Sequence, residues 1–175
     1  MISKIIAEEL IHKVKREIED AKKIVMVTHF GPDGDAMGAS LGMWHFLMAL
    51  EKEPKVILPT PPPDFLMWMP GAEQSLIYVF QKEEADKIIK EADLIFAVDF
   101  NTPSRLAMLA DSVVESKARK VMIDHHLNPN KEFADIIISY PQISSTSELI
   151  FRLICRMGHF SDINLGCAEC ISAGM

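Results

Sequence analysis

The stretch Val25–Gly42 constrains the fold of this chain more than any other, because it joins a buried strand to a helix through a tight turn. An apolar run at 24–27 leads into His29, and a turn containing Asp33 and Asp35 follows. A second apolar run with helical spacing comes directly after the turn. In open α/β sheets, ligands lie beyond the carboxyl ends of the strands, which is where this turn falls. We therefore expect a functional site at the turn.

The rest of the chain alternates short apolar runs with amphipathic segments. The apolar runs predict strands at 24–29, 55–58, 76–80, 94–98, 120–123 and 136–138. The amphipathic segments predict helices at 3–20, 35–51, 82–91, 105–116, 148–157 and 164–174. This alternation favours an α/β fold with a doubly wound, mostly parallel sheet and helices on both faces.

Composition narrows the possible partners and compartment. The 175 residues carry a net charge of −7, which argues against a long nucleic-acid duplex as the main partner. A small phosphorylated substrate stays compatible, because bound divalent cations reverse the local charge of an acidic pocket. No apolar run approaches the roughly 20 residues of a membrane span, and the charged N-terminus does not resemble a signal peptide. Three cysteines give no disulfide framework, so we expect a cytoplasmic protein without a membrane partner.

Potential metal ligands follow three of the predicted strands. The first set is the turn after His29, the second is Asp99, and the third is the run Asp124–His126. Parallel strands joined by helices end at one edge of the sheet, so these groups are expected to converge. Imidazoles combined with carboxylates suit Mn²⁺, Mg²⁺ or a related ion. Two such ions, about 3.5–4 Å apart, would bracket a phosphoryl group and an attacking water.

Each of these residues also has a purely structural interpretation. Asp33 and Asp35 would serve as ordinary turn or N-cap residues, and an isolated His29 would be a hydrogen-bonded core histidine. Asp99 and Asp124 would each cap a following helix. Two adjacent histidines at the end of a strand, however, have no routine packing role. The shared position of all three sets at strand ends favours the metal-site hypothesis.

Three motifs together resemble a known family. The segments THFGPDGDAMGASLG (28–42), VDF (98–100) and IDHH (123–126) are similar to successive motifs of the DHH phosphoesterases. The closest resemblance is to the branch of bifunctional nano-RNases and 3′-phosphoadenosine-5′-phosphate phosphatases, which are often called exopolyphosphatase-related and are related to RecJ-type exonucleases. The resemblance implies a three-layer α/β/α domain.

The resemblance also implies a set of metal ligands. His29 and Asp33 would bind one Mn²⁺, Asp35 and His125 would bind a second, and Asp99 would bridge the two. Mg²⁺ or Co²⁺ would be alternative ions at both positions.

Further residues receive substrate-related roles from the same resemblance. His126 would face the substrate phosphate as a hydrogen-bond donor or general acid, and Asp124 would orient it. Arg105, Ser145 and Thr146 lie where the family has recurrent polar residues and would contact the substrate. For Arg105, a surface ion pair is the competing interpretation.

The resemblance implies an Mn²⁺-dependent phosphoesterase acting on short oligonucleotides or 3′-phosphoadenosine-5′-phosphate. Hydrolysis of inorganic pyrophosphate, polyphosphate or cyclic dinucleotides is the first alternative, and a non-catalytic nucleotide-binding domain is the second. Residues 1–175 would form the N-terminal domain, ending before the family's fourth metal motif and without its smaller C-terminal domain. We therefore expect a truncated chain that would bind its second metal weakly and have little or no activity. A homodimer is a further candidate state.

Two other motifs receive structural interpretations. Cys167 and Cys170 form a C-x-x-C pattern without a second pair, so we expect neither a zinc site nor redox chemistry. Gly34 and Gly38 are not followed by the Lys-Ser/Thr of a Walker loop, and we interpret them as points of close approach to a neighbouring strand.

Overall fold

The structure, a computed structural model, describes residues 4–175. The regular helices and strands are α1 (Glu8–Asp20), β1 (Lys23–Thr28), α2 (Gly34–Ala49), β2 (Glu53–Leu58), β3 (Leu76–Ile77), α3 (Lys82–Glu91), β4 (Leu94–Val98), α4 (Ala110–Glu115), β5 (Arg119–Asp124), β6 (Ile136–Ser139), α5 (Thr146–Arg156) and α6 (Leu165–Gly174). Short 3₁₀ helices supplement them: η1 (Asp64–Leu66), η2 (Ala72–Gln74), η3 (Pro103–Leu109) and η4 (Phe160–Asp162).

The six strands form one sheet in the order β3-β2-β1-β4-β5-β6, and all its pairings are parallel. This finding confirms the predicted doubly wound sheet. The order reverses between β1 and β4, which are neighbours although they are distant in sequence. Such a reversal opens a crevice at the carboxyl ends of the two strands, which is where ligands bind in folds of this class. β5 pairs with β4, so three adjacent strands end at this edge.

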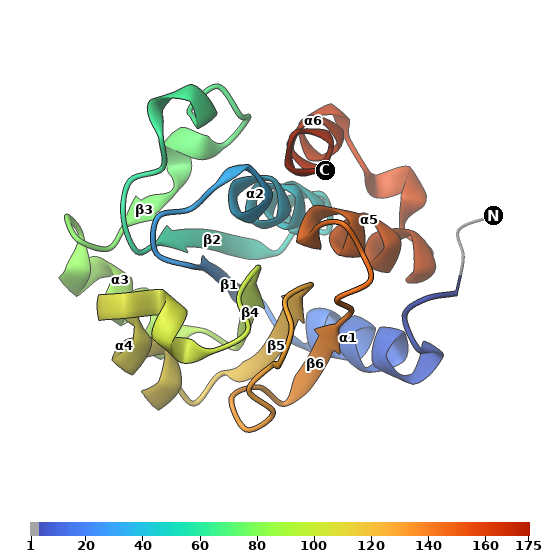
Figure 1. Ribbon diagram of the computed structural model, residues 1–175, viewed down its shortest axis with the longest axis horizontal. Helices are drawn as coiled ribbons and strands as arrows, with labels where there is room; N and C mark the ends of the chain where they lie inside the picture. The colour runs from blue at the N-terminus through green and yellow to red at the C-terminus, as the bar shows by residue number, and fades with distance from the viewer. Residues whose placement is uncertain (1–3) are drawn as a thin grey trace.

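Two apolar cores separate the sheet from the helices on its two faces. Alternate strand residues, such as Met26 and Phe96, pack with α1, α2 and α5. The intervening residues, such as Val25 and Ile95, pack with α3, η3 and α4 on the other face. Figure 1 shows the two groups of helices on opposite sides of the sheet. The predicted three-layer arrangement is therefore confirmed.

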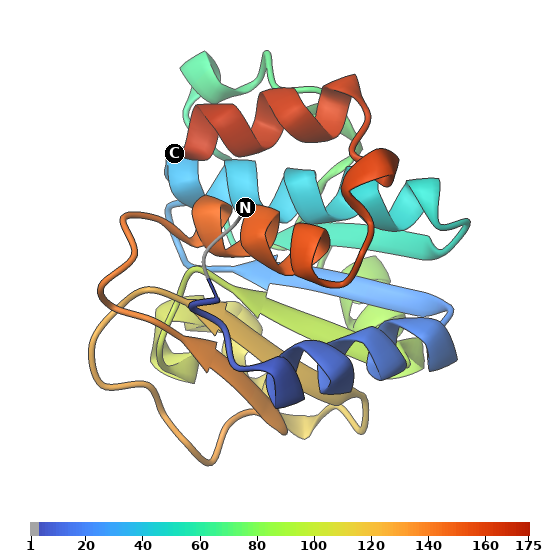
Figure 2. The same ribbon diagram turned by 90° about the vertical axis from the view of Figure 1, so that its right-hand side faces the viewer.

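The last helix, α6, lies outside the layer that covers the sheet. Figure 2 shows it running along α2 on the side away from the strands. A Cβ atom added to Gly38 would lie 2.5 Å from the carbonyl oxygen of Cys170, and one added to Gly42 would lie 2.6 Å from the side chain of Ile171. These glycines therefore permit close contact between two helices. The contact with a strand that was predicted for Gly34 and Gly38 was wrong, because both glycines face α6.

Some predicted boundaries differ from the observed ones. The expected strand at 76–80 ends after Ile77, because the chain turns at 78–80. The expected helix at 105–116 is a 3₁₀ segment followed by α4, and Ala107 lies at the break with φ of +49°. The first helix begins at Glu8 rather than near residue 3, which lies outside the described residues.

Within residues 4–175, no helix combines the length and apolar character needed to cross a membrane.

Candidate metal centre at the carboxyl edge of the sheet

His29 follows β1 and lies buried at the sheet edge. Its side chain is 6% exposed, and Nε2 lies 3.6 Å from Asp99 Oδ2 and 3.8 Å from Asp33 Oδ1. On the other side of the ring, Nδ1 lies 2.9 Å from the main-chain oxygen of Phe30. A hydrogen bond from Nδ1–H to this carbonyl would leave Nε2 free to bind a metal ion, which is the usual arrangement of histidine ligands.

Two carboxylates occupy the turn and first residues of α2. Asp33 is the N-cap, because its Oδ1 accepts a hydrogen bond from the Ala36 N–H at 3.0 Å. Its side chain is 66% exposed, and the same Oδ1 is the oxygen that lies near His29. Asp35 lies two residues further on and is mostly buried. The capping interpretation of Asp33 and its position beside His29 are therefore compatible.

The N-terminus of α5 holds the Asp35 carboxylate. The N–H of Thr146 donates to Asp35 Oδ2 at 2.7 Å, and the N–H of Ser147 donates to Oδ1 at 2.8 Å. A helix N-terminus stabilises a negative charge through these unpaired donors and through its dipole. Oδ2 also lies 3.6 Å from His125 Nε2, so Asp35 is fixed close to the histidines that follow β5.

Asp99 lies at the centre of the cluster. Its side chain is 2% exposed, and its backbone has φ of +64°, in the left-handed region that aspartate tolerates better than most residues. Oδ2 faces His29, whereas Oδ1 lies 3.6 Å from His125 Nε2. The Thr146 hydroxyl donates to Oδ1 at 2.8 Å. One carboxylate thus contacts groups from both neighbouring strands.

Asp124, the last residue of β5, and the two histidines that follow it differ in exposure. Asp124 is fully buried, and its two oxygens accept from the His126 backbone N–H at 3.0 Å and pair with His126 Nδ1 at 2.7 Å. This pair fixes the His126 ring and directs Nε2 away from Asp124. His126 is 43% exposed, and His125 is 25% exposed with Nδ1 3.2 Å from the Ile143 carbonyl.

The charged groups of the cluster shift one another's pKa values. Burial lowers the pKa of His29, but Asp33 and Asp99 outweigh this effect and raise the pKa to about 10. The same interaction with His29 lowers the pKa of Asp33 to about 2. Burial and the neighbouring charge of Asp99 raise the pKa of Asp35 to about 6, against the hydrogen bonds from α5. A proton on His29 therefore supplies positive charge among these acids in the metal-free protein.

The donor set fits divalent cations. Ligand atoms of His29, Asp33 and Asp99 lie within 4.8 Å of one another, and so do those of Asp99, His125 and His126. Asp99 belongs to both groups. Imidazole nitrogens with carboxylate oxygens match the preferences of Mn²⁺ and related ions. The second group contains His126 in addition to the expected ligands Asp99 and His125. Asp35, the other expected ligand, lies next to this group, with Oδ2 3.6 Å from His125 Nε2.

The remaining predicted residues lie around this cluster in different ways. Ser145 and Thr146 are buried, and Ser145 Oγ caps α5 by accepting from the Glu148 N–H at 3.1 Å. The contacts of Thr146 hold Asp35 and Asp99, and substrate binding by either residue stays a prediction. Arg105 is exposed, and its carbonyl oxygen accepts from the Phe30 N–H at 2.7 Å. The role of its guanidinium also stays a prediction.

Sequence reasoning missed the contact between α5 and Asp35. The expected helix began at residue 148, whereas α5 begins at Thr146. The pattern Ser145-x-x-Glu148 is a capping-box signature and could have placed the N-terminus correctly.

The C-x-x-C cysteines lie on α6, away from the acids. Cys167 Sγ lies 3.2 Å from the Gly42 carbonyl oxygen, and Cys170 Sγ lies 3.4 Å from that of Pro70. Burial raises the pKa of Cys167 to about 11 and that of Cys170 to about 12. Thiols with such pKa values stay protonated at neutral pH, so both act as packing residues between α6 and its neighbours.

Comparisons with known proteins agree with this geometry. The family model described as "DHH family, N-terminal domain" matches residues 23–175. The crystal structure of an exopolyphosphatase-related protein from Bacteroides fragilis is similar with a TM-score of 0.98 and 53% identity, covering 99% of this chain and 51% of that one.

Two more distant similarities were found. The bifunctional oligoribonuclease and PAP phosphatase NrnA of Thermus thermophilus is 31% identical over 149 residues, which are 85% of this chain and 41% of NrnA. RecJ of Thermus thermophilus in complex with Mn²⁺ has a TM-score of 0.54 and 17% identity, covering 95% of this chain and 23% of RecJ, which shows a shared fold. The chain thus spans about half the length, or less, of these relatives.

Proposed function

Because this chain belongs to the DHH family of phosphoesterases, we propose that it forms the metal-binding part of an Mn²⁺-dependent enzyme that hydrolyses short oligonucleotides or 3′-phosphoadenosine-5′-phosphate. The position of Asp99 carries this proposal. Its two oxygens each lie 3.6 Å from a histidine Nε2, one from His29 and one from His125. A carboxylate between two imidazoles is the arrangement expected of a bridging ligand.

The proposed ligand sets follow from these contacts and from the family motifs. His29 and Asp33 would bind one ion, Asp35 and His125 would bind the other, and Asp99 would contact both. When bound, the ions would supply positive charge for the phosphate oxygens and lower the pKa of a bound water. The buried hydrogen bonds from Thr146 would keep Asp35 and Asp99 in position.

His126 would act on the leaving group of the substrate. Its Nδ1 is held by Asp124, so its Nε2 is the nitrogen available to a substrate at the exposed side of the cluster. In the imidazolium form, Nε2–H would donate a proton to the departing oxygen, and the buried Asp124 would stabilise the positive charge. Asp124 is accordingly a positioning residue.

Metal binding tests the proposal independently of activity. We expect calorimetry to detect Mn²⁺ binding to the 175-residue chain. We expect His29→Gln to weaken this binding at least about tenfold. His159→Gln is the matched control, because His159 also pairs with an acid, Asp162 at 2.7 Å, but lies in the turn beyond the far end of α5. Equal binding by both variants would contradict the assigned centre.

A substrate panel tests the chemistry. The chain would be assayed with Mn²⁺ against a 5′-phosphorylated diadenosine dinucleotide, 3′-phosphoadenosine-5′-phosphate, cyclic di-AMP and pyrophosphate, with a chelator as control. We expect any metal-dependent cleavage to be confined to one of the first two. Phosphate release from pyrophosphate alone would replace this proposal with the pyrophosphatase alternative.

A further inference from the structure

The segment that follows β2 exposes two aromatic side chains in a fixed position. Phe65 is 74% exposed and Trp68 is 62% exposed, while the intervening Leu66 and the following Met69 are buried. Phe65 lies in η1 and Trp68 lies two residues after its end, so one short segment carries both rings. The buried neighbours anchor the segment to the domain. The folded chain therefore holds both rings exposed to solvent.

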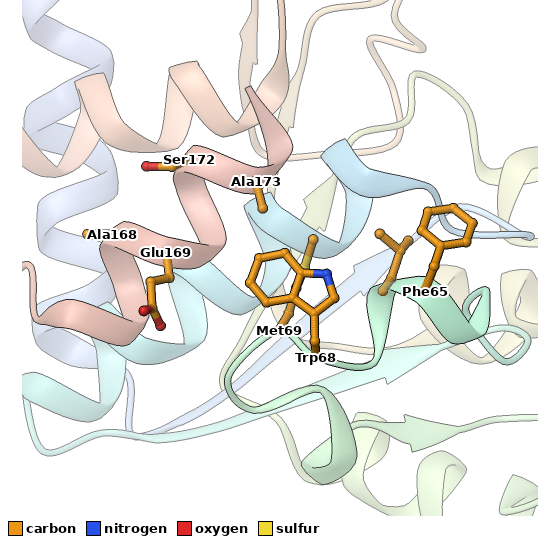
Figure 3. A pocket seen from close by; sticks show the side chains of 8 residues that line it. Phe65, Trp68, Met69, Ala168, Glu169, Ser172 and Ala173 are labelled. Carbon is orange, nitrogen blue, oxygen red and sulfur yellow. The ribbon is translucent and has the colours of Figure 1, made fainter.

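These rings form one wall of a groove of about 530 Å³ whose other wall is α6. Figure 3 shows Trp68 and Phe65 on one side, with Ala173 and Glu169 on the helix opposite. Among the described residues that line the groove, Glu169 is the one that carries a charge, and none is a lysine or arginine. A groove with aromatic and small apolar walls and a single carboxylate suits a flat, uncharged, hydrogen-bonding group better than a phosphate.

Both walls lead to the turn that carries the acids. The Ala173 carbonyl would lie 3.8 Å from a Cβ atom on Gly34, the residue between Asp33 and Asp35. On the other wall, the chain just before η1 contacts the same turn, because Thr60 Oγ1 accepts from the Gly31 N–H at 3.1 Å. The groove therefore lies beside the turn that carries Asp33 and Asp35.

We propose that Phe65 and Trp68 form a stacking surface for a base of a nucleotide substrate whose phosphate lies at the metal centre; this inference rests on the function proposed above. Glu169 would accept a hydrogen bond from an exocyclic amino group of the base or from a ribose hydroxyl. Base–aromatic stacking tolerates any base, because every base has a π-face. This surface would favour nucleotides over pyrophosphate without selecting a sequence.

Binding measurements separate the base from the phosphate. The probes are a non-hydrolysable phosphorothioate diadenosine dinucleotide, its abasic analogue and inorganic phosphate, each titrated by calorimetry in Mn²⁺. We expect Phe65→Ala and Trp68→Ala each to weaken dinucleotide binding about 5- to 150-fold, the range that corresponds to one stacked base. Binding of the other two probes would stay unchanged, and Trp68→Phe would restore most of the affinity.

Phe160→Ala is the matched control, because Phe160 is 67% exposed and lies in η4, at the end of α6 opposite the acids. Equal affinity of the wild-type chain for the dinucleotide and its abasic analogue, with Mn²⁺ bound, would overturn the stacking surface and leave the metal centre intact. Absence of Mn²⁺ binding would overturn both proposals. Unchanged nucleotide binding together with conversion of a dimer to a monomer by Phe65→Ala, in sedimentation measurements, would assign the groove to a second copy instead.

Discussion

Helix α2 takes part in two regions that are held together by opposite physical means. At its N-terminus, buried acids and imidazoles from three strands are fixed by hydrogen bonds and by mutual charge. Along its flank, Gly38 and Gly42 contact α6 mainly through apolar atoms and backbone, with one uncharged hydrogen bond from the Cys167 thiol to the Gly42 carbonyl. The first region keeps its charges despite the cost of desolvation, whereas the second gains stability from close packing. Substitutions in the two regions should therefore change different measurable quantities.

The largest effect is expected at the centre of the acid cluster. Asp99→Asn would weaken Mn²⁺ binding more than about 100-fold, because both proposed ions lose a charged ligand. Calorimetric titration measures this loss. Asp93→Asn is a matched control at the other end of β4, where Asp93 accepts from the Lys22 and Lys23 N–H groups. Unchanged metal stoichiometry in Asp99→Asn would contradict the two-metal arrangement and the contrast between the regions.

The helix contact should respond in stability instead. Gly38→Ala would lower the free energy of unfolding by about 1–3 kcal/mol, because the new methyl group meets backbone atoms of α6 that have little freedom to move. Gly42→Ala should cost less, since its close neighbour is the flexible end of Ile171. Urea denaturation in the presence of a chelator measures both. A stabilised Gly38→Ala would show that helix propensity outweighs the packing.

The pH dependence of metal binding sharpens the electrostatic side of the comparison. His29 has a pKa of about 10 in the metal-free protein, so a metal ion must displace its proton near neutral pH. Mn²⁺ affinity should therefore rise with pH, by up to about tenfold per unit between about pH 6.5 and 8.5. Titrations at several pH values across this range test the slope. A flat profile would show that metal binding displaces no proton from His29.

The smallest effect is expected where the two regions meet, at the N-terminus of α5. Ser145→Ala removes the cap of this helix and should lower stability by about 1 kcal/mol. It should also weaken Mn²⁺ binding slightly, because the N–H groups of Thr146 and Ser147 hold Asp35. Asn164→Ala, which removes the corresponding cap of α6, is the control with the stability effect alone. Equal Mn²⁺ affinity in both variants would show that the Ser145 cap does not help to position Asp35.

Local patterns in the sequence were sufficient to predict the sheet and the gathering of the acids. The runs that end before His29, Asp99 and Asp124 are apolar because their strands are covered on both faces. Parallel connections then require a common edge for their ends. Because β1 pairs directly with β4, the residues that follow these strands are neighbours, and His29 Nε2 lies 3.6 Å from Asp99 Oδ2.

Other features were beyond local patterns because they depend on which element packs against which. Gly34 and Gly38 indicate close approach but not the partner, which is α6 and not the expected strand. The hydrogen bonds from Thr146 and Ser147 to Asp35 join segments that are far apart in the chain. The same holds for the groove, whose walls come from residues 65–69 and from α6.

The contact at Gly174 has a mechanical consequence. A methyl group there would overlap Ser147 Oγ and would lie 3.2 Å from the Gly34 carbonyl. The tip of the outermost helix is therefore wedged between the two chain segments that position Asp35. A tilt of α6 would therefore push on Ser147 and Gly34, which flank Asp35, and would alter the spacing of the acids in the candidate metal centre.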